Sequence, residues 1–308
     1  MEKKLREFCL RERLPVLWNT PLSDYTSFRI GGPADAILLP DTEKAFLSLL
    51  CFLKSESIPF RVIGNGTNLL FADEGFRGAV VSTRHVRGIS VVGRTARAAA
   101  GTPLNVLCRT LAEHSLDGFP SLYGIPGTVG GAVFMNAGAF GATVSDHLVF
   151  VSAYRVSSGK IETFSKDALR FSYRHSLFCE ARDAIILSAE FLLPFGNQEN
   201  IREKMRQSIE KRIETQPSAL PCAGSAFLRP KDGYASELIE RAGLKGACIG
   251  GAAVSLKHAG FIVNLGGATA KEVLALMSLI QREVEKQFQV SLIPEIEYVE
   301  SYKEGFSQ

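Results

Sequence analysis

Two glycine-rich loops carry the strongest sign of chemistry in this sequence. The first is Gly64-Asn65-Gly66-Thr67-Asn68 and the second covers residues 124–131. Glycine lets a backbone turn sharply and approach a ligand closely, so that successive N–H groups form a concave anion site. The first loop lacks the third glycine of the dinucleotide fingerprint, and the second lacks the Gly-Lys-Ser/Thr ending of a P-loop. One such loop is more often a tight turn, but two in one predicted domain favour a large phosphate-bearing cofactor.

Regular elements must hold these two loops in place. A short strand at 61–63 leads into the first loop, and the apolar run 69–71 follows it. A helix capped by Asp41 precedes that strand, with its apolar side chains at helical spacing. Thr102 and Pro103 look like the cap and the first residue of another helix, which lies between the two loops in the sequence.

The last third of the chain has its own pattern. Composition changes near Gly196, and the helix that follows carries charges on one face and apolar side chains on the other. The apolar face consists of Ile201, Met205, Ile209 and Ile213. Thr269 and Glu272 form a capping box for a final helix, and a hairpin is expected around residues 157–160. The mixture predicts an α+β protein with a boundary near residue 196.

Composition excludes several classes of protein. A chain of 308 residues with ordinary apolar and charged content is globular and has two or three domains. The net charge of +3 without basic blocks argues against nucleic-acid binding. The charged opening, residues 1–7, leads into no apolar core of signal-peptide length, and no apolar run reaches the ~20 residues of a membrane span. We therefore expect a cytoplasmic protein that binds neither membrane nor nucleic acid.

Cysteine and histidine show no ligand spacing. The six cysteines are widely scattered, which predicts reduced and mostly buried thiols. The five histidines are scattered too, so we expect neither a metal site nor a Ser-His-Asp hydrolase.

The order of the short motifs is more specific than any one of them. Together they resemble the successive signatures of the UDP-N-acetylenolpyruvoylglucosamine reductase family over nearly the whole chain. The motifs are Thr26-Ser27-Phe28-Arg29-Ile30-Gly31-Gly32-Pro33-Ala34, Gly64-Asn65-Gly66-Thr67-Asn68-Leu69-Leu70, Gly124-Ile125-Pro126-Gly127-Thr128-Val129-Gly130-Gly131, Met135-Asn136-Ala137-Gly138-Ala139, Phe171-Ser172-Tyr173-Arg174-His175-Ser176, Ala223-Gly224-Ser225-Ala226-Phe227, Ala242-Gly243-Leu244-Lys245-Gly246, Lys257-His258-Ala259-Gly260-Phe261-Ile262-Val263-Asn264 and Pro294-Glu295.

The resemblance implies a fold and a reaction. The fold is an FAD-binding domain of the vanillyl-alcohol-oxidase type, with α+β subdomains at 1–82 and 83–195, and a substrate domain at 196–308. The reaction uses NADPH and non-covalent FAD to reduce UDP-N-acetylglucosamine enolpyruvate to UDP-N-acetylmuramate for peptidoglycan synthesis, with no obligate protein partner. The compact segment 174–225 resembles the shorter class of these enzymes, which lacks an extra tyrosine-bearing loop.

The resemblance also assigns the residues that contact the cofactor. They are Arg29, Gly64, Asn65, Gly66, Thr67, Asn68, Leu69, Gly124, Ile125, Pro126, Gly127, Thr128, Gly131 and Ala132.

Three residues match the family's catalytic positions. Ser225 is the implied proton donor, since an enolate is a strong enough base to take a proton from a positioned hydroxyl. The planar fork of Arg174 suits a carboxylate and stabilises the developing enolate. Glu295, beside an anionic substrate, should have a raised pKa and donate a hydrogen bond as a neutral acid. Each residue has a simpler interpretation outside its matched motif. Ser225 would be an ordinary loop residue, Arg174 a surface charge or part of a structural ion pair, and Glu295 an exposed residue at a strand edge.

Four residues are implied substrate contacts, namely Tyr173, Arg229, Lys257 and His258. The chain departs from the family nearby: Leu228-Arg229-Pro230 replaces Lys-Asn-Pro, Gly260 replaces an asparagine, and Ile293 replaces a glutamate. These changes put the polar contacts near Ser225 in question, and Arg229 could supply a replacement charge.

Two other functions compete with the reductase. A related flavin oxidase with another substrate would share the glycine loops but should lack Ser225, Lys257-His258 and Glu295 in their matched contexts. A flavin-binding protein without turnover should have lost at least one catalytic residue, and this chain has kept all three.

Overall fold

The N-terminal part is built on a mixed four-stranded sheet. The computed structural model describes residues 2–231 and 233–301. The strand order is β1 (Val16–Pro21), β2 (Pro33–Leu38), β5 (Phe76–Ser82), β3 (Phe60–Ile63). Strands β2, β5 and β3 are parallel, and β1 is antiparallel to β2. Because side chains alternate along a strand, Leu38 packs under the helices α1 (Glu2–Glu12) and α2 (Glu43–Ser55), whereas Ile37 belongs to a core cluster on the opposite face.

The second part is an antiparallel sheet with helices on one face. Its order is β11 (Lys160–Ser165), β10 (Leu148–Arg155), β12 (Ala184–Leu192), β7 (Thr95–Ala99), β6 (Ile89–Val92). Helices α3 (Leu104–Glu113) and α4 (Val129–Phe134) bury their apolar side chains against it. A small hairpin, β8 (Gly138–Ala139) and β9 (Ala142–Thr143), follows α4. The predicted hairpin at 157–160 is confirmed, since it joins β10 to β11.

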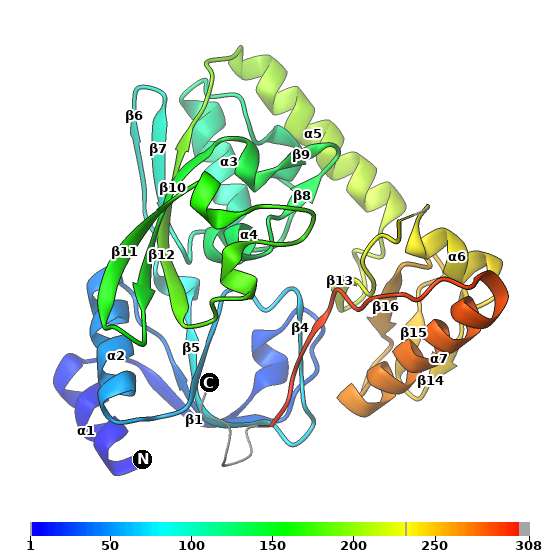
Figure 1. The fold of residues 1–308 in the computed structure, drawn as a ribbon, viewed down its shortest axis with the longest axis horizontal. Coiled ribbons are helices and arrows are strands. Elements are labelled where there is room, and N and C mark those ends of the chain that lie inside the picture. The colour runs from blue at the N-terminus through cyan, green and yellow to red at the C-terminus, as the bar shows by residue number, and fades with distance from the viewer. Residues whose placement is uncertain (1, 232, 302–308) are drawn as a thin grey trace.

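The C-terminal part has its own sheet and core. Its antiparallel order is β13 (Cys222–Ser225), β16 (Phe261–Asn264), β15 (Ala252–Val254), β14 (Cys248–Ile249), with α6 (Ala235–Arg241) and α7 (Ala270–Phe288) packed on it. Thr269 and Glu272 form the predicted capping box of α7. The chain then returns to the first part, where β17 (Glu297–Val299) pairs in parallel with β4 (Leu69–Phe71), the red strand beside β4 in Figure 1.

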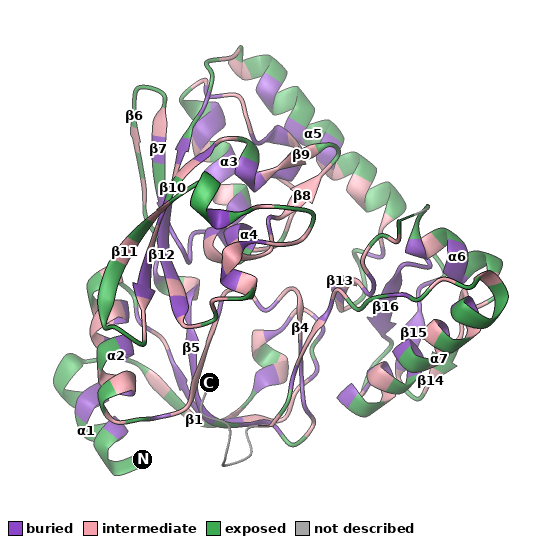
Figure 2. Ribbon diagram, in the orientation of Figure 1, coloured by how far each residue is buried: buried purple, intermediate pink, exposed green. Residues whose placement is uncertain are grey.

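The long helix α5 (Gln198–Thr215) joins the second and third parts (Figure 1). Ile201 and Met205 pack into the core of the second part, but Ile213 is 54% exposed. Figure 2 shows green, exposed surface along much of this helix. The apolar residues predicted for one face of α5 therefore differ in their surroundings, and only those at its beginning pack into a hydrophobic core. The domain limits at 82 and 195 remain predictions.

Three local expectations were wrong. Thr42, not Asp41, caps α2, because its hydroxyl accepts a bond from Ala45 N at 3.1 Å. Helix α3 begins at Leu104, one residue later than expected, and the Thr102 hydroxyl bonds to Gly88 instead of capping it. The expectation of mostly buried thiols holds for Cys9 and Cys108, whereas Cys51 and Cys248 are exposed.

Candidate active site

A cavity of about 1610 Å³ is lined by residues from all three parts of the fold. It exceeds the ~300–1,000 Å³ typical of small-ligand pockets, so it has room for a dinucleotide together with a second ligand. Every residue predicted to contact the cofactor lines it. These are Arg29, Gly64, Asn65, Gly66, Thr67, Asn68, Leu69, Gly124, Ile125, Pro126, Gly127, Thr128, Gly131 and Ala132.

The first glycine loop is held in place by the backbone at Tyr25 and by the side chain of Arg84. Gly66 has φ +63°, and a Cβ there would lie 2.2 Å from the carbonyl oxygen of Tyr25, so only glycine fits. Arg84 Nη2 donates to the carbonyl oxygens of Tyr25 at 2.9 Å and Asn65 at 3.3 Å. In the described part of the chain, the backbone amides of Asn65 and Thr67 meet no backbone or side-chain acceptor. They are available to an anion.

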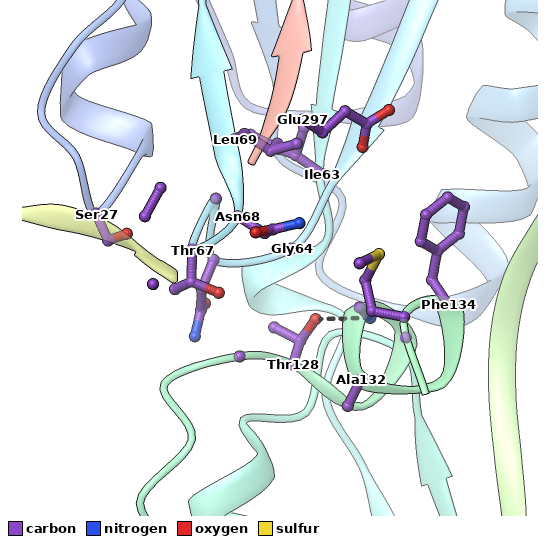
Figure 3. Close-up of a pocket in the computed structure, with 18 of the residues that line it drawn as sticks. Ser27, Ile63, Gly64, Thr67, Asn68, Leu69, Thr128, Ala132, Phe134 and Glu297 are labelled. Atoms are coloured by element: carbon purple, nitrogen blue, oxygen red, sulfur yellow. Dashed lines mark hydrogen bonds between the residues drawn. The ribbon is translucent and has the colours of Figure 1, made fainter. Parts of the chain in front are cut away.

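The second glycine loop lies against the first. Thr128 caps α4 by accepting from Gly131 N at 3.4 Å, the dashed line in Figure 3. A Cβ on Gly64 would lie 2.3 Å from Thr128 Oγ1, and Asn65 Nδ2 donates to the carbonyl of Pro126 at 2.9 Å. The two loops therefore form one cradle, with backbone close on both sides. This arrangement fits the diphosphate of FAD.

The three predicted catalytic residues come together at this cavity. Ser225 ends β13, opposite Phe261 of β16. The chain around Glu295 runs beside it, because Glu295 N donates to the Ala226 carbonyl at 2.9 Å. From the second part, Arg174 Nε donates to Glu295 Oε1 at 2.7 Å. A hydroxyl, a guanidinium and a carboxyl from distant segments thus line one site.

Burial controls the protonation of Glu295, whose side chain is only 11% exposed. Removal from water raises the pKa of this carboxyl above its ordinary value, and the pairing with Arg174 opposes the shift without cancelling it. The prediction that the pKa of Glu295 is raised therefore agrees in direction, although burial rather than a bound anion is the cause here. Arg174 itself adopts a left-handed backbone, with φ +55°.

Arg212 is a cavity residue that the sequence reasoning missed. It lies in the last turn of α5, and its Cδ is 3.1 Å from where a Cβ on Gly124 would be. Burial lowers the pKa of Arg212, and the like charge of Arg174 adds to this. Two neighbouring guanidiniums favour an anionic ligand. The signal was available, because Arg212 lies three residues after Ile209, on the side of α5 that leaves the core.

A carboxylate and two arginines on another wall of the cavity were also missed, namely Glu297, Arg61 and Arg182. Arg61 Nη2 donates to Glu297 Oε1 at 2.6 Å, and Arg182 pairs with the same oxygen. Glu297 lies only two residues after Glu295, and this closeness was the one signal for it in the sequence. Their partners lie too far away in sequence to be found.

The four predicted substrate contacts do not line this cavity. The guanidinium of Arg229 lies over two exposed rings, 5.9 Å from the centroid of Tyr173 and 4.6 Å from that of Tyr234. Lys257 donates through its ammonium to the Ile213 carbonyl at the end of α5. The structure thus puts Tyr173 and Arg229 together, next to Arg174, and ties Lys257 to the end of α5. Their roles remain predictions.

The departure at Gly260 lies against His258, which matches the family. His258 is half-buried, and burial lowers its pKa, so that its neutral Nδ1 accepts from Gly260 N at 3.1 Å. A Cβ on Gly260 would come within 3.0 Å of the same ring. An asparagine at this position would require the ring to shift by a few tenths of an ångström. The glycine thus permits this orientation of His258.

The departures at Leu228 and Ile293 lie on neighbouring segments. Leu228 N donates to the Ile293 carbonyl at 2.8 Å, and Phe227 bridges Pro294 beside them. Where the family has a lysine and a glutamate on this pair of segments, this chain has two aliphatic residues. The two exchanged positions are therefore in direct backbone contact.

Other classes of site find no support in residues 2–231 and 233–301. No group of three or more His, Cys, Asp or Glu side chains there is placed to hold a metal ion. No helix within the same residues combines the length and apolar character needed to cross a membrane.

Comparisons with known proteins agree with this geometry. Residues 34–165 match the family described as FAD binding domain, and residues 216–299 match UDP-N-acetylenolpyruvoylglucosamine reductase, C-terminal domain. The reductase of that name from Caldanaerobacter subterraneus is 43% identical, over 96% of this chain and 97% of its own. The one from Latilactobacillus sakei is 43% identical over 94% of both chains. The crystal structure of the Thermus caldophilus reductase has a TM-score of 0.76 at 33% identity, covering 93% of this chain and 98% of its own.

Fold and site together define a flavoprotein oxidoreductase, in which an FAD-binding domain of the vanillyl-alcohol-oxidase type is joined to a separate α+β domain. The length and extent of the matches narrow the class further. The chain belongs to the UDP-N-acetylenolpyruvoylglucosamine reductase family.

Proposed function

We propose that this enzyme reduces the enolpyruvyl ether of UDP-N-acetylglucosamine enolpyruvate to the lactyl ether of UDP-N-acetylmuramate, a step in peptidoglycan synthesis. The observation that carries this proposal is the Arg174–Glu295 pair, at 2.7 Å, in the same cavity as Ser225 and the diphosphate cradle. NADPH is the electron source and the cytoplasm is the proposed location, because NADPH and nucleotide sugars are made there.

The substrate carboxylate must be held while charge develops on it. Bound FAD would supply the hydride, which comes from NADPH, to the methylene carbon of the enolpyruvyl group. The electron pair then moves toward the substrate carboxylate. The guanidinium of Arg174 can stabilise this negative charge by donating two parallel hydrogen bonds to the carboxylate. Arg212 adds a second positive charge to the same cavity.

Ser225 is placed to complete the reduction by protonating the α-carbon of the resulting enolate. Gly224, with φ +78°, turns the chain just before it, and β13 holds the residue opposite Phe261. This pairing fixes the backbone of Ser225, and a weak acid needs such positioning to act as a proton donor.

Glu295 stabilises the same intermediate as a neutral acid. Its burial favours the protonated form, and an anionic substrate carboxylate nearby favours it further. A protonated carboxyl can donate a hydrogen bond to the developing negative charge, which a carboxylate cannot do.

An NADPH-oxidation assay tests the proposed function directly. We expect rapid NADPH oxidation with UDP-N-acetylglucosamine enolpyruvate present and only slow oxidation without it. UDP-N-acetylglucosamine, which lacks the enolpyruvyl group, is the control. Equal rates with both sugars would point to a flavin oxidase with another substrate.

The purified protein should be yellow and contain non-covalent FAD. The two loops form a cradle for a diphosphate, in which the backbone amides of Asn65 and Thr67 have no other acceptor in the described structure. An absorbance spectrum, followed by chromatography of the chromophore released on denaturation, identifies it. A colourless protein that FAD cannot reconstitute would refute the cofactor assignment.

A single glycine substitution sharpens that test. Gly66→Ala should weaken FAD binding by about tenfold or more, since the methyl group would meet the Tyr25 carbonyl at 2.2 Å and strain the loop. Gly88→Ala is the matched control, because a Cβ there has open space. Fluorescence titration of the apoprotein with FAD measures both affinities, and thermal unfolding of the apoproteins shows whether the fold survives.

A further inference from the structure

The segment that carries Glu295, just before β17, is held to the first glycine loop by backbone and side-chain amide contacts. Asn68 Nδ2 donates to the Glu295 carbonyl at 3.0 Å, and Glu297 N donates to the Asn68 carbonyl at 2.9 Å. Residue 297 is also where β17 begins to pair with β4, opposite Leu69. The active-site carboxyl therefore lies just ahead of the point where the chain re-enters the FAD-binding domain.

The side chain of Glu297 joins separate parts of the molecule at this point. Its carboxylate binds Arg61 of β3 at 2.6 Å, and it pairs with Arg182, in the turn before β12. The side chains of Glu297 and Arg61 are only 20% and 21% exposed. Arg182 also lies over the Phe134 ring of α4, 6.0 Å from its centroid. One carboxylate thus connects β17 to both subdomains of the FAD-binding domain.

Glu297 and Arg61 are partly buried on the cavity wall, where Figure 3 shows Glu297 among the lining side chains, whereas Arg182 is more exposed. Burial by itself would raise the pKa of Glu297, but the two guanidiniums outweigh burial and hold it below its ordinary value. The carboxylate is therefore charged at neutral pH. A partly buried carboxylate that pairs with two arginines resists displacement more strongly than an exposed ion pair on the surface.

Only Ile296, where the chain bends, separates Glu295 from Glu297, and both glutamates line the cavity. A shift of the triad would move both. Glu295 depends on its position, because its contact with Arg174 is a single hydrogen bond of 2.7 Å and its protonation depends on burial. A displacement of about 1 Å near reacting groups can cost as much as 10²-fold in rate.

We propose that Glu297 is a positioning residue, which through Arg61 and Arg182 fixes the depth at which Glu295 enters the active site. It acts through Glu295 and has no contact of its own with the reacting carbon. The proposal rests on the proposed function, because the readout is turnover of the UDP-sugar.

Glu297→Gln is the first test, since it removes the charge and keeps the shape. We expect kcat for the UDP-sugar to fall by about tenfold, with its KM changed by less than about threefold. Reduction of the enzyme by NADPH alone should stay within about twofold of wild type. Glu43→Gln is the matched control, because Glu43 also binds an arginine across the two subdomains, Arg97 at 2.8 Å, but away from the cavity.

Charge exchange is the second test. Arg61→Glu and Glu297→Arg should each lower kcat, whereas the double variant should recover to within about threefold of wild type because the pair is rebuilt in reverse. Arg182, whose side chain is 45% exposed, can turn to solvent in the double variant. Thermal unfolding and FAD content are measured for every variant.

The outcomes separate the hypotheses. A lower melting temperature with wild-type kcat in Glu297→Gln would overturn the proposal, since the triad would then only stabilise the fold. A loss that the double variant fails to recover would overturn it too. A wild-type enzyme that the UDP-sugar cannot reoxidise would overturn the proposed function and this inference together, whereas a reactive wild type matched by Glu297→Gln refutes this inference alone.

Discussion

Replacing Ser225 by alanine should lower turnover of the UDP-sugar by about 10²-fold or more, the usual scale for loss of a general acid. Reduction of the bound flavin by NADPH should remain nearly normal, because that half-reaction takes no proton from this serine. FAD binding should be unaffected as well, since the residues of the cradle are untouched. The two half-reactions are therefore expected to separate at this residue.

Stopped-flow spectroscopy at the flavin band follows each half-reaction by itself. Mixing with NADPH measures reduction, and mixing the reduced enzyme with the UDP-sugar measures reoxidation. Ser278→Ala is a suitable control, since Ser278 lies on α7 and its hydroxyl only bonds back to the Leu274 carbonyl at 2.9 Å. In Ser225→Ala, hydride addition can reverse when the enolate is not trapped, so some hydride return without product is consistent with the proposal. Reoxidation and product formation at the wild-type rate would show that water or another side chain is the acid.

Local signals in the sequence predicted local structure well. The Thr269–Glu272 box predicted the start of α7, and the glycine loops predicted a cradle, because a capping box or a glycine turn depends on a few adjacent residues. Asp41 failed as a cap for a related reason. Thr42 beside it is also a cap-forming residue, so residue type alone does not fix the start of α2 to within one position.

Long-range partners could not be predicted in the same way. Glu297 lies 236 positions from Arg61 and 115 from Arg182. Nothing in the periodicity of either segment indicates that they meet. The same holds for α5, whose apolar spacing is regular although Ile201 faces a core and Ile209 lines the cavity. Spacing reports which side chains share a helix face, but not what covers that face.

The catalytic trio lies between these two cases. Its members were identified by their places within short motifs, and the fold brings them to one cavity from three segments. Their contact geometry added what the motifs could not contain. Arg174 and Glu295 bind each other directly, and the carboxyl is buried enough for its pKa to rise.

Glu295→Ala should lower turnover by about 10²–10³-fold, the scale for removing one donor to a developing negative charge. Glu295→Gln should retain much more activity, within about tenfold of wild type, because the amide keeps a hydrogen-bond donor of similar shape. Steady-state kinetics with the UDP-sugar compares the two, and thermal unfolding checks that Arg174 without its partner does not destabilise the fold. Equal losses in both variants would indicate that the full negative charge of Glu295 is needed, for example to order the proton donor.

The pH dependence of turnover shows which protonation state of Glu295 is the active one. If the neutral acid is the active form, reoxidation by the UDP-sugar is fastest below the pKa of Glu295 and slows as pH rises through it. Burial raises that pKa above the ordinary value of about 4.3, so the decline should come at higher pH than for an exposed glutamate. Glu295→Gln has no such proton to lose and should show no decline in this range. A wild-type rate that instead rises through this range would mean that the carboxylate is the active form, so that Glu295 would not donate a hydrogen bond to the enolate.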